Sequence, residues 1–177
     1  MGRPPLNKDT TLCISLAARP SNIGTRFHNY LYDQLGLDFI YKAFTTTDIV
    51  AAIGGVRALG IRGCSVSMPF KEAVLELVDE VEQSALAIRS VNTIVNDGGV
   101  LSASNTDYIA VQRLIAEHGL DASRSVLIHG SGGMAKAVGS AFRDNGFHDG
   151  IVVARNPQAG PELAEQLGYH WRPHVGG

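Results

Sequence analysis

A short apolar run leads into a glycine-rich turn at Ser125-Val126-Leu127-Ile128-His129-Gly130-Ser131-Gly132-Gly133-Met134-Ala135. Residues 125–128 predict a strand and residues 134–145 predict a helix, so the turn joins a strand to a helix. The turn matches the pattern G-x-G-x-x-[G/A], whose glycines let the backbone turn sharply and approach a pyrophosphate closely. Free N–H groups and the positive end of the following helix then favour phosphate. We therefore predict a dinucleotide site formed by Gly130, Ser131, Gly132, Gly133, Met134 and Ala135.

The next predicted strand, residues 151–154, indicates which dinucleotide is bound. It ends at Arg155-Asn156, where an NAD site usually has an acidic residue for the ribose hydroxyls. A guanidinium suits a 2′-phosphate instead, so we predict NADP as the cofactor and Arg155 and Asn156 as cofactor-binding residues. A tight glycine-rich turn beside a solvated arginine is the alternative without a ligand. The agreement of strand, glycines and arginine favours the nucleotide.

Upstream, short apolar runs alternate with helical stretches, which is typical of βαβ units and a parallel sheet. Strands are predicted at residues 11–16, 38–44 and 61–67, and Gly36 is expected to end the first helix. Thr46 or Thr47 is expected to cap the second helix. The run Asn96-Asp97-Gly98-Gly99 predicts a β-hairpin.

These patterns predict an α/β protein of two domains. The first is an α/β domain with a mainly parallel sheet, expected at residues 1–106. A linking helix and joint follow at residues 107–121, and a partial dinucleotide-binding domain is expected at residues 122–177. We expect this second domain to be incomplete and Rossmann-like, because only two clear strands are predicted where such sheets have about six.

Composition narrows the class of protein. The 177 residues are 45% hydrophobic and 18% charged with a net charge of −2, which indicates a globular chain without an electrostatic footprint for nucleic acid or anionic membrane. We find no pattern for a secretory leader or a membrane span, and expect a cytoplasmic protein. Cys13 and Cys64 lie in apolar runs outside any Cys/His cluster, so we expect buried thiols and no metal site.

Three polar residues are candidates for chemistry. If Pro69 is the first helical residue, Lys71 lies in the first turn, where the helix dipole disfavours a cation and lowers its pKa. A solvated lysine paired with an acid would explain the same position. Asp107 lies at a predicted helix start, where an acid is stabilising without any catalytic role. Asn92 lies within a predicted strand, which asparagine disfavours, so it has either a polar task or a strand-end hydrogen bond.

Taken together, these segments resemble the shikimate dehydrogenase family. The segment Arg19-Pro20-Ser21-Asn22-Ile23-Gly24-Thr25-Arg26-Phe27-His28-Asn29 is similar to its shikimate-dehydrogenase-like branch. The other matching pieces are Pro69-Phe70-Lys71-Glu72, Ser90-Val91-Asn92-Thr93, Asn105-Thr106-Asp107, Gly130-Ser131-Gly132-Gly133-Met134-Ala135 and Ala154-Arg155-Asn156. Their order and spacing span most of the chain.

The resemblance implies reversible reduction of 3-dehydroshikimate by NADPH, with Lys71 and Asp107 as the catalytic pair. Ser67 and Asn92 would bind substrate hydroxyls. The family's carboxylate-binding Ser-x-Ser corresponds to Asn22-Ile23-Gly24 or, with a shift, to residues within Ser21–Thr25, so the substrate-binding residues implied are Ser21, Asn22, Thr25, Ser67 and Asn92. Family members continue beyond this length with the rest of the nucleotide sheet and a final helix.

Three functions remain open at this point. The first is a dehydrogenase acting on shikimate or a close relative such as quinate, a soluble enzyme with a small-molecule substrate and a possible homodimer. The second is a truncated or regulatory paralogue that binds the ligand or nucleotide without turnover. The third, a lysine-using dehydrogenase of another substrate such as a folate, is disfavoured by Ser90-Val91-Asn92-Thr93.

Overall fold

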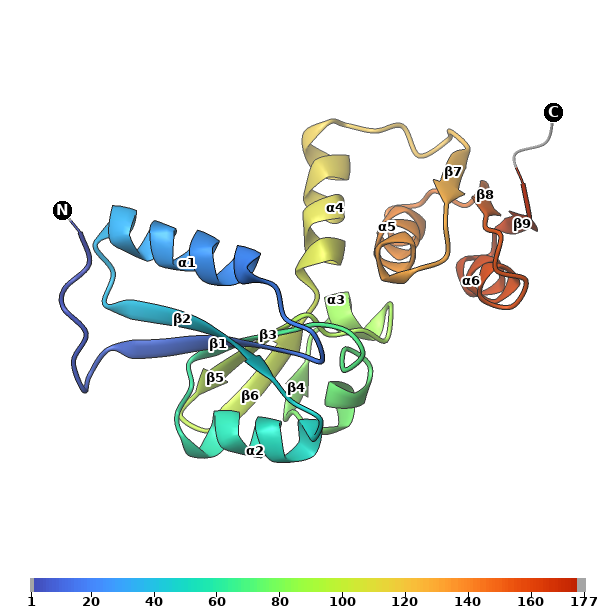
Figure 1. Ribbon diagram of the computed structural model, residues 1–177. Helices are drawn as coiled ribbons and strands as arrows, with labels where there is room; N and C mark the ends of the chain where they lie inside the picture. The colour runs from blue at the N-terminus through green and yellow to red at the C-terminus, as the bar shows by residue number, and fades with distance from the viewer. Residues whose placement is uncertain (1, 175–177) are drawn as a thin grey trace. The chain divides into compact units, whose positions relative to one another are not determined.

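Two separate β-sheets organise the chain, one of six strands and one of three (Figure 1). The computed structural model describes residues 2–174, and the chain divides into two units, Met1–Asn105 and Thr106–Gly177. The last residues of the predicted second domain, Val175, Gly176 and Gly177, lie outside the described residues. The predicted α/β class, with a mainly parallel sheet in the first unit, is confirmed.

The first unit has a mixed sheet with the strand order β2-β1-β3-β5-β6-β4. Strand β1 is parallel to both β2 and β3, whereas β5 is antiparallel to both of its neighbours. The elements of this unit are β1 (Thr11–Ala17), α1 (Asn22–Leu35), β2 (Phe39–Thr45), α2 (Ile49–Ala58), β3 (Gly63–Val66), the 3-10 helix η1 (Ala73–Glu76), β4 (Glu80–Val81), α3 (Gln83–Leu86), β5 (Thr93–Asp97) and β6 (Val100–Ser104).

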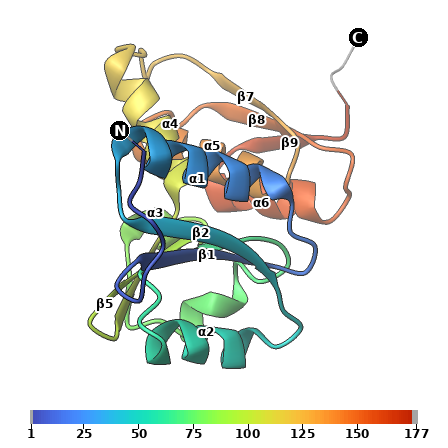
Figure 2. The ribbon, with the colours of Figure 1, turned by 60° about the vertical axis from the view of Figure 1, so that its left-hand side comes forward.

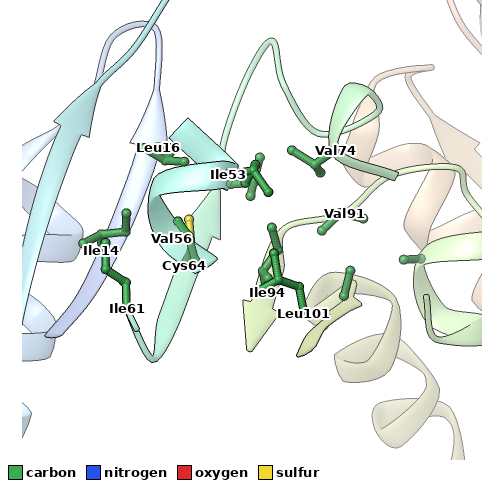
Figure 3. Packing of buried hydrophobic residues seen from close by; sticks show 13 residues of the cluster. Ile14, Leu16, Ile53, Val56, Ile61, Cys64, Val74, Val91, Ile94 and Leu101 are labelled. Atoms are coloured by element: carbon green, nitrogen blue, oxygen red, sulfur yellow. The ribbon is translucent and has the colours of Figure 1, made fainter. Parts of the chain in front are cut away.

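Helices α1 and α2 cover opposite faces of β1 and β2 (Figures 1 and 2). The face under α2 holds the apolar core, where Ile53 and Val56 of α2 pack against Ile14 of β1 and Ile94 of β5 (Figure 3). Val56 and Ile94 are both 0% exposed. Each such side chain contributes about 1.5–3 kcal/mol to folding through its burial. This face therefore fixes the sheet on which the polar residues of the unit are placed.

The α1 face is held by side-chain hydrogen bonds to the edge strand β2. The amide of Asn29 donates to the carbonyl of Tyr41 at 2.8 Å and accepts from its N–H at 3.2 Å. It therefore satisfies two backbone groups of the edge strand that a neighbouring strand would otherwise bond. The ring of His28 stacks on that of Tyr41 with centroids 4.3 Å apart. Helix α1 ends as predicted at Gly36, whose φ of 64° suits a residue without a Cβ.

The cap predicted for the second helix was wrong. Asp48 caps α2, and its carboxylate accepts from the N–H of Ala51 at 2.9 Å. Thr46 instead accepts from the N–H of Asp48 at 3.1 Å, in the turn that precedes the helix. Threonine and aspartate both favour caps, so sequence alone could not rank Thr46, Thr47 and Asp48. The predicted hairpin is confirmed, with β5 and β6 paired from Asp97 and Val100 onward.

The second unit has three parallel strands in the order β7-β8-β9. Figure 2 shows α5 and α6 together on one side of them. The third strand was not predicted, because its three residues are too few to show a pattern. The elements are α4 (Thr106–Glu117), β7 (Val126–His129), α5 (Gly133–Asp144), β8 (Gly150–Val153), α6 (Ala159–Leu167) and β9 (His170–Arg172).

Helix α4 packs on α5 through Tyr108, which is 2% exposed. Its hydroxyl donates to the carboxylate of Asp144 at 2.6 Å and accepts from the amide of Gln112 at 3.1 Å. Burial, and then this hydrogen bond to Asp144, raise the pKa of Tyr108 to about 12. Leu114 of the same helix is 51% exposed, and Tyr108 occupies the buried face.

Gly139 allows the closest approach of α5 to its neighbours. A Cβ there would lie 2.9 Å from Cδ1 of Ile128 and would also overlap Leu167. We expect Gly139→Ala to lower the free energy of unfolding by about 1–3 kcal/mol through overpacking, measured by urea denaturation. Gly54→Ala in α2 is the control, because no atom lies within 4 Å of its Cβ position and alanine should raise helix stability there. Equal effects of the two substitutions would contradict the packing argument.

Tyr108→Phe tests the bond between α4 and α5. We expect it to lower the free energy of unfolding by about 1.5 kcal/mol at neutral pH, because a buried hydrogen bond to a carboxylate is lost. The pKa of Tyr108 is raised from about 10 in the unfolded chain to about 12 in the fold. Wild-type stability is therefore lost as the pH rises from 10 to 12, and the difference between the two proteins should narrow over that range. Tyr30→Phe, at a tyrosine that is 61% exposed, should change neither the free energy of unfolding nor its dependence on pH.

Candidate functional site

Two backbone hydrogen bonds bring three of the predicted site residues into one neighbourhood of the first unit. The N–H of Val66 donates to the carbonyl of Asn92 at 2.9 Å, and the N–H of Val91 donates to the carbonyl of Lys71 at 2.8 Å. Ser67 follows Val66 at the end of β3, and its own N–H donates to Leu16 of β1 at 2.9 Å. Ser67, Lys71 and Asn92 therefore lie on adjoining segments at the carboxyl end of β3, the edge where open α/β sheets bind ligands.

The helix expected to begin at Pro69 is absent, so the prediction that Lys71 lies in a first helical turn was wrong. Residues 68–72 form turns, and the helical segment that follows, η1, is a 3-10 helix of four residues. The carbonyl of Lys71 accepts from Val91 of a distant segment, so it is not used in a continuing helical ladder. The helix-dipole argument for Lys71 is thereby removed, and any role of this amine depends on its neighbours instead.

Asn92 also lies outside the strand in which it was expected. Strand β5 begins at Thr93, and the N–H of Asn92 donates to the carbonyl of Ser104 at 3.1 Å. Its side-chain oxygen accepts from the hydroxyl of Thr93 at 3.0 Å. Asn92 thus lies just before the first residue of β5 and bonds to the neighbouring segment. The low preference of asparagine for strands therefore does not apply to it.

A pocket of about 220 Å³ lies between the start of α1 and the ends of β1 and β3. Of the predicted substrate-binding residues, Ser21 and Ser67 line it, whereas Asn22 and Thr25 do not. Ser21 is the N-cap of α1, and its hydroxyl accepts from the N–H of Ile23 at 3.4 Å. The carbonyl of Thr25 accepts from Asn29 at 2.7 Å, within the helix.

The pocket contains polar residues to which the sequence analysis gave no role. They are Ser15, Arg19 and Tyr41. The alternation of β1 places Ser15 on the α1 face, but this signal alone does not distinguish a pocket residue from a solvated serine. Tyr41 resembles an ordinary core aromatic in sequence, and only the tertiary structure reveals its place in the pocket wall.

Asp107 belongs to the second unit, in the first turn of α4. Asn105, two residues earlier, is the last residue of the first unit and is 1% exposed. The Asn105 amide donates to the carbonyl of Ser90 at 2.8 Å, and its N–H donates to the hydroxyl of Ser84 at 3.0 Å. The last residue of the first unit is therefore attached to the segment that leads to Asn92. Catalytic pairing of Asp107 with Lys71 stays a prediction.

The glycine turn has the geometry that a phosphate site needs. Gly130 has a φ of 115°, a conformation that favours glycine, and its N–H donates to the carbonyl of Val153 at 2.8 Å. Gly132 is the N-cap of α5 and supplies no side-chain hydrogen bond, and the first turn of α5 contains no acidic residue. The first N–H groups of α5 are thus not capped by a side chain, which suits an anion. Gly133, Met134 and Ala135 form the first turn of the helix itself.

A pocket of about 350 Å³ opens beside this turn in the second unit. Four of the residues predicted to bind the cofactor line it, Gly130, Ser131, Arg155 and Asn156, together with His129 and His174. The side chain of Asn156 accepts from the N–H groups of Gln158 and Ala159 at 3.0 and 2.9 Å, so its oxygen organises the start of α6. The arginine and two histidines surround the pocket with groups that can carry positive charge.

Among residues 2–174, no group of three or more His, Cys, Asp or Glu residues could hold a metal ion, and no helix has the length and apolar content to cross a membrane. Cys64 is buried, and burial raises the pKa of its thiol to about 12. Cys13 is only half-buried, which departs from the expectation of two buried thiols, and burial also raises its pKa.

The fold and the two pockets define an α/β protein with a Rossmann-like second unit. Residues 22–94 match the model of the shikimate dehydrogenase substrate binding domain. A shikimate dehydrogenase-like protein of Haemophilus influenzae is 62% identical over 164 residues, which are 93% of this chain and 60% of that protein. These matches, with the structural ones below, show that the chain is similar to shikimate dehydrogenases over nearly all of its length.

Two solved structures extend the comparison. Shikimate 5-dehydrogenase of Listeria monocytogenes, in complex with shikimate and NAD, is 27% identical with a TM-score of 0.83, covering 96% of this chain and 62% of that one. The enzyme of Thermus thermophilus, in complex with NADP(H) and shikimate, is 28% identical with a TM-score of 0.78, covering 92% and 63%. The chain thus spans about three fifths of the length of these relatives.

Proposed function

We propose that this chain acts as an NADP-dependent oxidoreductase that interconverts shikimate, or a close relative such as quinate, and its 3-dehydro form. The observation that carries the proposal is the placement of Ser67, Lys71 and Asn92 at the carboxyl end of β3 by the bonds Val66–Asn92 and Val91–Lys71. Similarity to the shikimate dehydrogenase family supports the reaction type. Because the two solved relatives contain NAD and NADP(H) respectively, the choice of nucleotide needs an argument from this chain.

The chain's residues would handle the proton of the reacting hydroxyl. As the alcohol becomes a ketone, the O–H proton passes to the amine of Lys71, and the carboxylate of Asp107 assists by holding the hydroxyl and stabilising the positive charge on the lysine. Ser67 and Asn92 hydrogen-bond the neighbouring hydroxyls and fix the ring's orientation. NADP supplies the hydride acceptor when bound, so the protein contributes orientation and proton transfer.

The second unit fits a phosphorylated dinucleotide. The turn at Gly130 and the start of α5 offer backbone N–H groups to the pyrophosphate. Arg155 lines the adjoining pocket, and its side chain forms no ion pair within residues 2–174. A guanidinium in that position complements a 2′-phosphate, which NADP has and NAD lacks.

Location and assembly belong to the same proposal. Neither thiol is in a disulfide, which supports a reducing compartment such as the cytoplasm. A homodimer stays a prediction, and sedimentation of the purified chain would test it.

The first test is turnover. Mixed with shikimate and NADP⁺, the wild-type chain should produce reduced cofactor, followed by its absorbance. Lys71→Ala and Asp107→Asn should each lower the rate about a hundredfold or more, because proton transfer by a positioned group contributes on that scale. Lys42→Ala, at an exposed lysine of β2, should leave the rate unchanged. Binding of shikimate without any turnover would contradict the proposal and favour a ligand-binding role.

The second test is cofactor preference. We expect Arg155→Ala to weaken NADP⁺ binding about tenfold or more while NAD⁺ binding stays the same, because only the former loses a charge-assisted hydrogen bond. Calorimetric titration of both nucleotides measures the two effects. Arg113→Ala, on the exposed surface of α4, removes the same charge and should change neither affinity. An unchanged preference in Arg155→Ala would refute the role of this arginine.

A further inference from the structure

We propose that Arg19 binds the carboxylate of the substrate, in the pocket beside the start of α1. The inference rests on the proposed function, since it concerns the same small hydroxylated acid. It assigns the acid-binding role to a residue in the pocket wall, whereas the predicted substrate residues Asn22 and Thr25 do not line that pocket.

The chemistry of the pocket favours an acid with hydroxyl groups. Arg19 is the one charged residue in its lining, and no carboxylate accompanies it. Four hydroxyl-bearing residues surround the same space: Ser15, Ser21, Tyr41 and Ser67. A guanidinium provides paired N–H donors that match a carboxylate, and hydroxyls can both donate to and accept from the hydroxyls of a ligand.

Arg19 is available for such a ligand. Its side chain is exposed, and it forms neither an ion pair nor a hydrogen bond with any other residue in the described range 2–174. The pocket also lies at the start of α1, a helix of 14 residues whose first turn contains no acidic residue. The positive end of the helix and the guanidinium therefore act on an anion in the same sense.

Tyr41 gives the pocket a rigid wall. The amide of Asn29 bonds both the N–H and the carbonyl of Tyr41, and the ring of Tyr41 stacks on His28. Burial lowers the pKa of His28, so this ring favours the neutral form and adds little charge near neutral pH. The positive charge of the pocket thus comes from Arg19, and its shape comes from the fixed tyrosine.

The volume of the pocket, about 220 Å³, suits a small molecule. Pockets for drug-sized ligands generally have about 300 Å³ or more. Gly24 borders the same space, and a Cβ there would lie 3.6 Å from the hydroxyl oxygen of Tyr41.

The test compares two ligands that differ only at the carboxylate, shikimate and its uncharged methyl ester, titrated against the cofactor-free chain. Wild-type protein should bind the acid more tightly than the ester. Arg19→Ala should weaken binding of the acid about ten- to hundredfold, the range for a hydrogen bond to a charged group, and should barely change binding of the ester. Arg19→Lys should recover part of the lost affinity, since it restores the charge without the paired donors.

Two further variants locate the effect. Arg26→Ala removes the same charge from the exposed surface of α1, outside the pocket lining, and should leave both affinities unchanged. Gly24→Leu places a large side chain in the pocket and should weaken both ligands alike. If Arg19→Ala and Arg26→Ala weaken the binding of shikimate equally, the general charge of the protein explains the result and the inference is overturned.

The outcome is separable from that of the proposed function. Charge-selective binding that depends on Arg19 supports the inference even if no reduced cofactor forms. The absence of reduced cofactor would contradict only the oxidoreductase proposal. Turnover that survives Arg19→Ala with an unchanged KM for shikimate would overturn the inference and leave the oxidoreductase standing. A wild-type chain that binds the acid no better than the ester would also overturn it.

Discussion

The carbonyl of Lys71 accepts a hydrogen bond from the N–H of Val91, and the arrangement of the first unit's site depends on this bond. A buried backbone group must find a partner, and here the partner lies 20 residues further along the chain. The bond ends any helix that Pro69 could have started and holds the lysine's segment against the one that carries Asn92. With the companion bond from Val66 to Asn92, it converts three separate loop residues into neighbours.

In the second unit the corresponding constraint is steric. At Gly139, Gly150 and Gly160 a Cβ would overlap Leu167, Tyr169 and Trp171 respectively. Helices α5 and α6 can approach the sheet closely only because these side chains are absent, and interiors at native density leave no spare room for a methyl group. The position of the glycine turn follows from this packing, since α5 begins directly after it and Ile128 of β7 contacts the same helix.

Local signals were sufficient for much of the fold and insufficient for the details of the site. Gly36 and the Gly98-Gly99 turn need positive φ, a requirement visible in a single residue type, and both were predicted correctly. The helix at Lys71 was wrong because a long-range hydrogen bond overrode the local pattern. The cap at Asp48 was missed because neighbouring threonines are equally good candidates. Tyr41 and Arg19 could not be assigned, since their place in a pocket arises from elements far apart in sequence.

The net charge of −2 gives the chain no general attraction for anions, so anionic ligands must be held by local groups. The distribution of acids along the helices is consistent with this. Helix α2 is capped by Asp48, α4 has Asp107 in its first turn, and α6 has Glu162. Helices α1 and α5 have neither an acidic cap nor an acid in the first turn, and each begins beside a pocket that contains an arginine. An acid there would compete with a bound carboxylate or phosphate for the same N–H groups. Those two helix starts, each with its arginine, therefore favour a negative charge more than the starts of α2, α4 and α6 do.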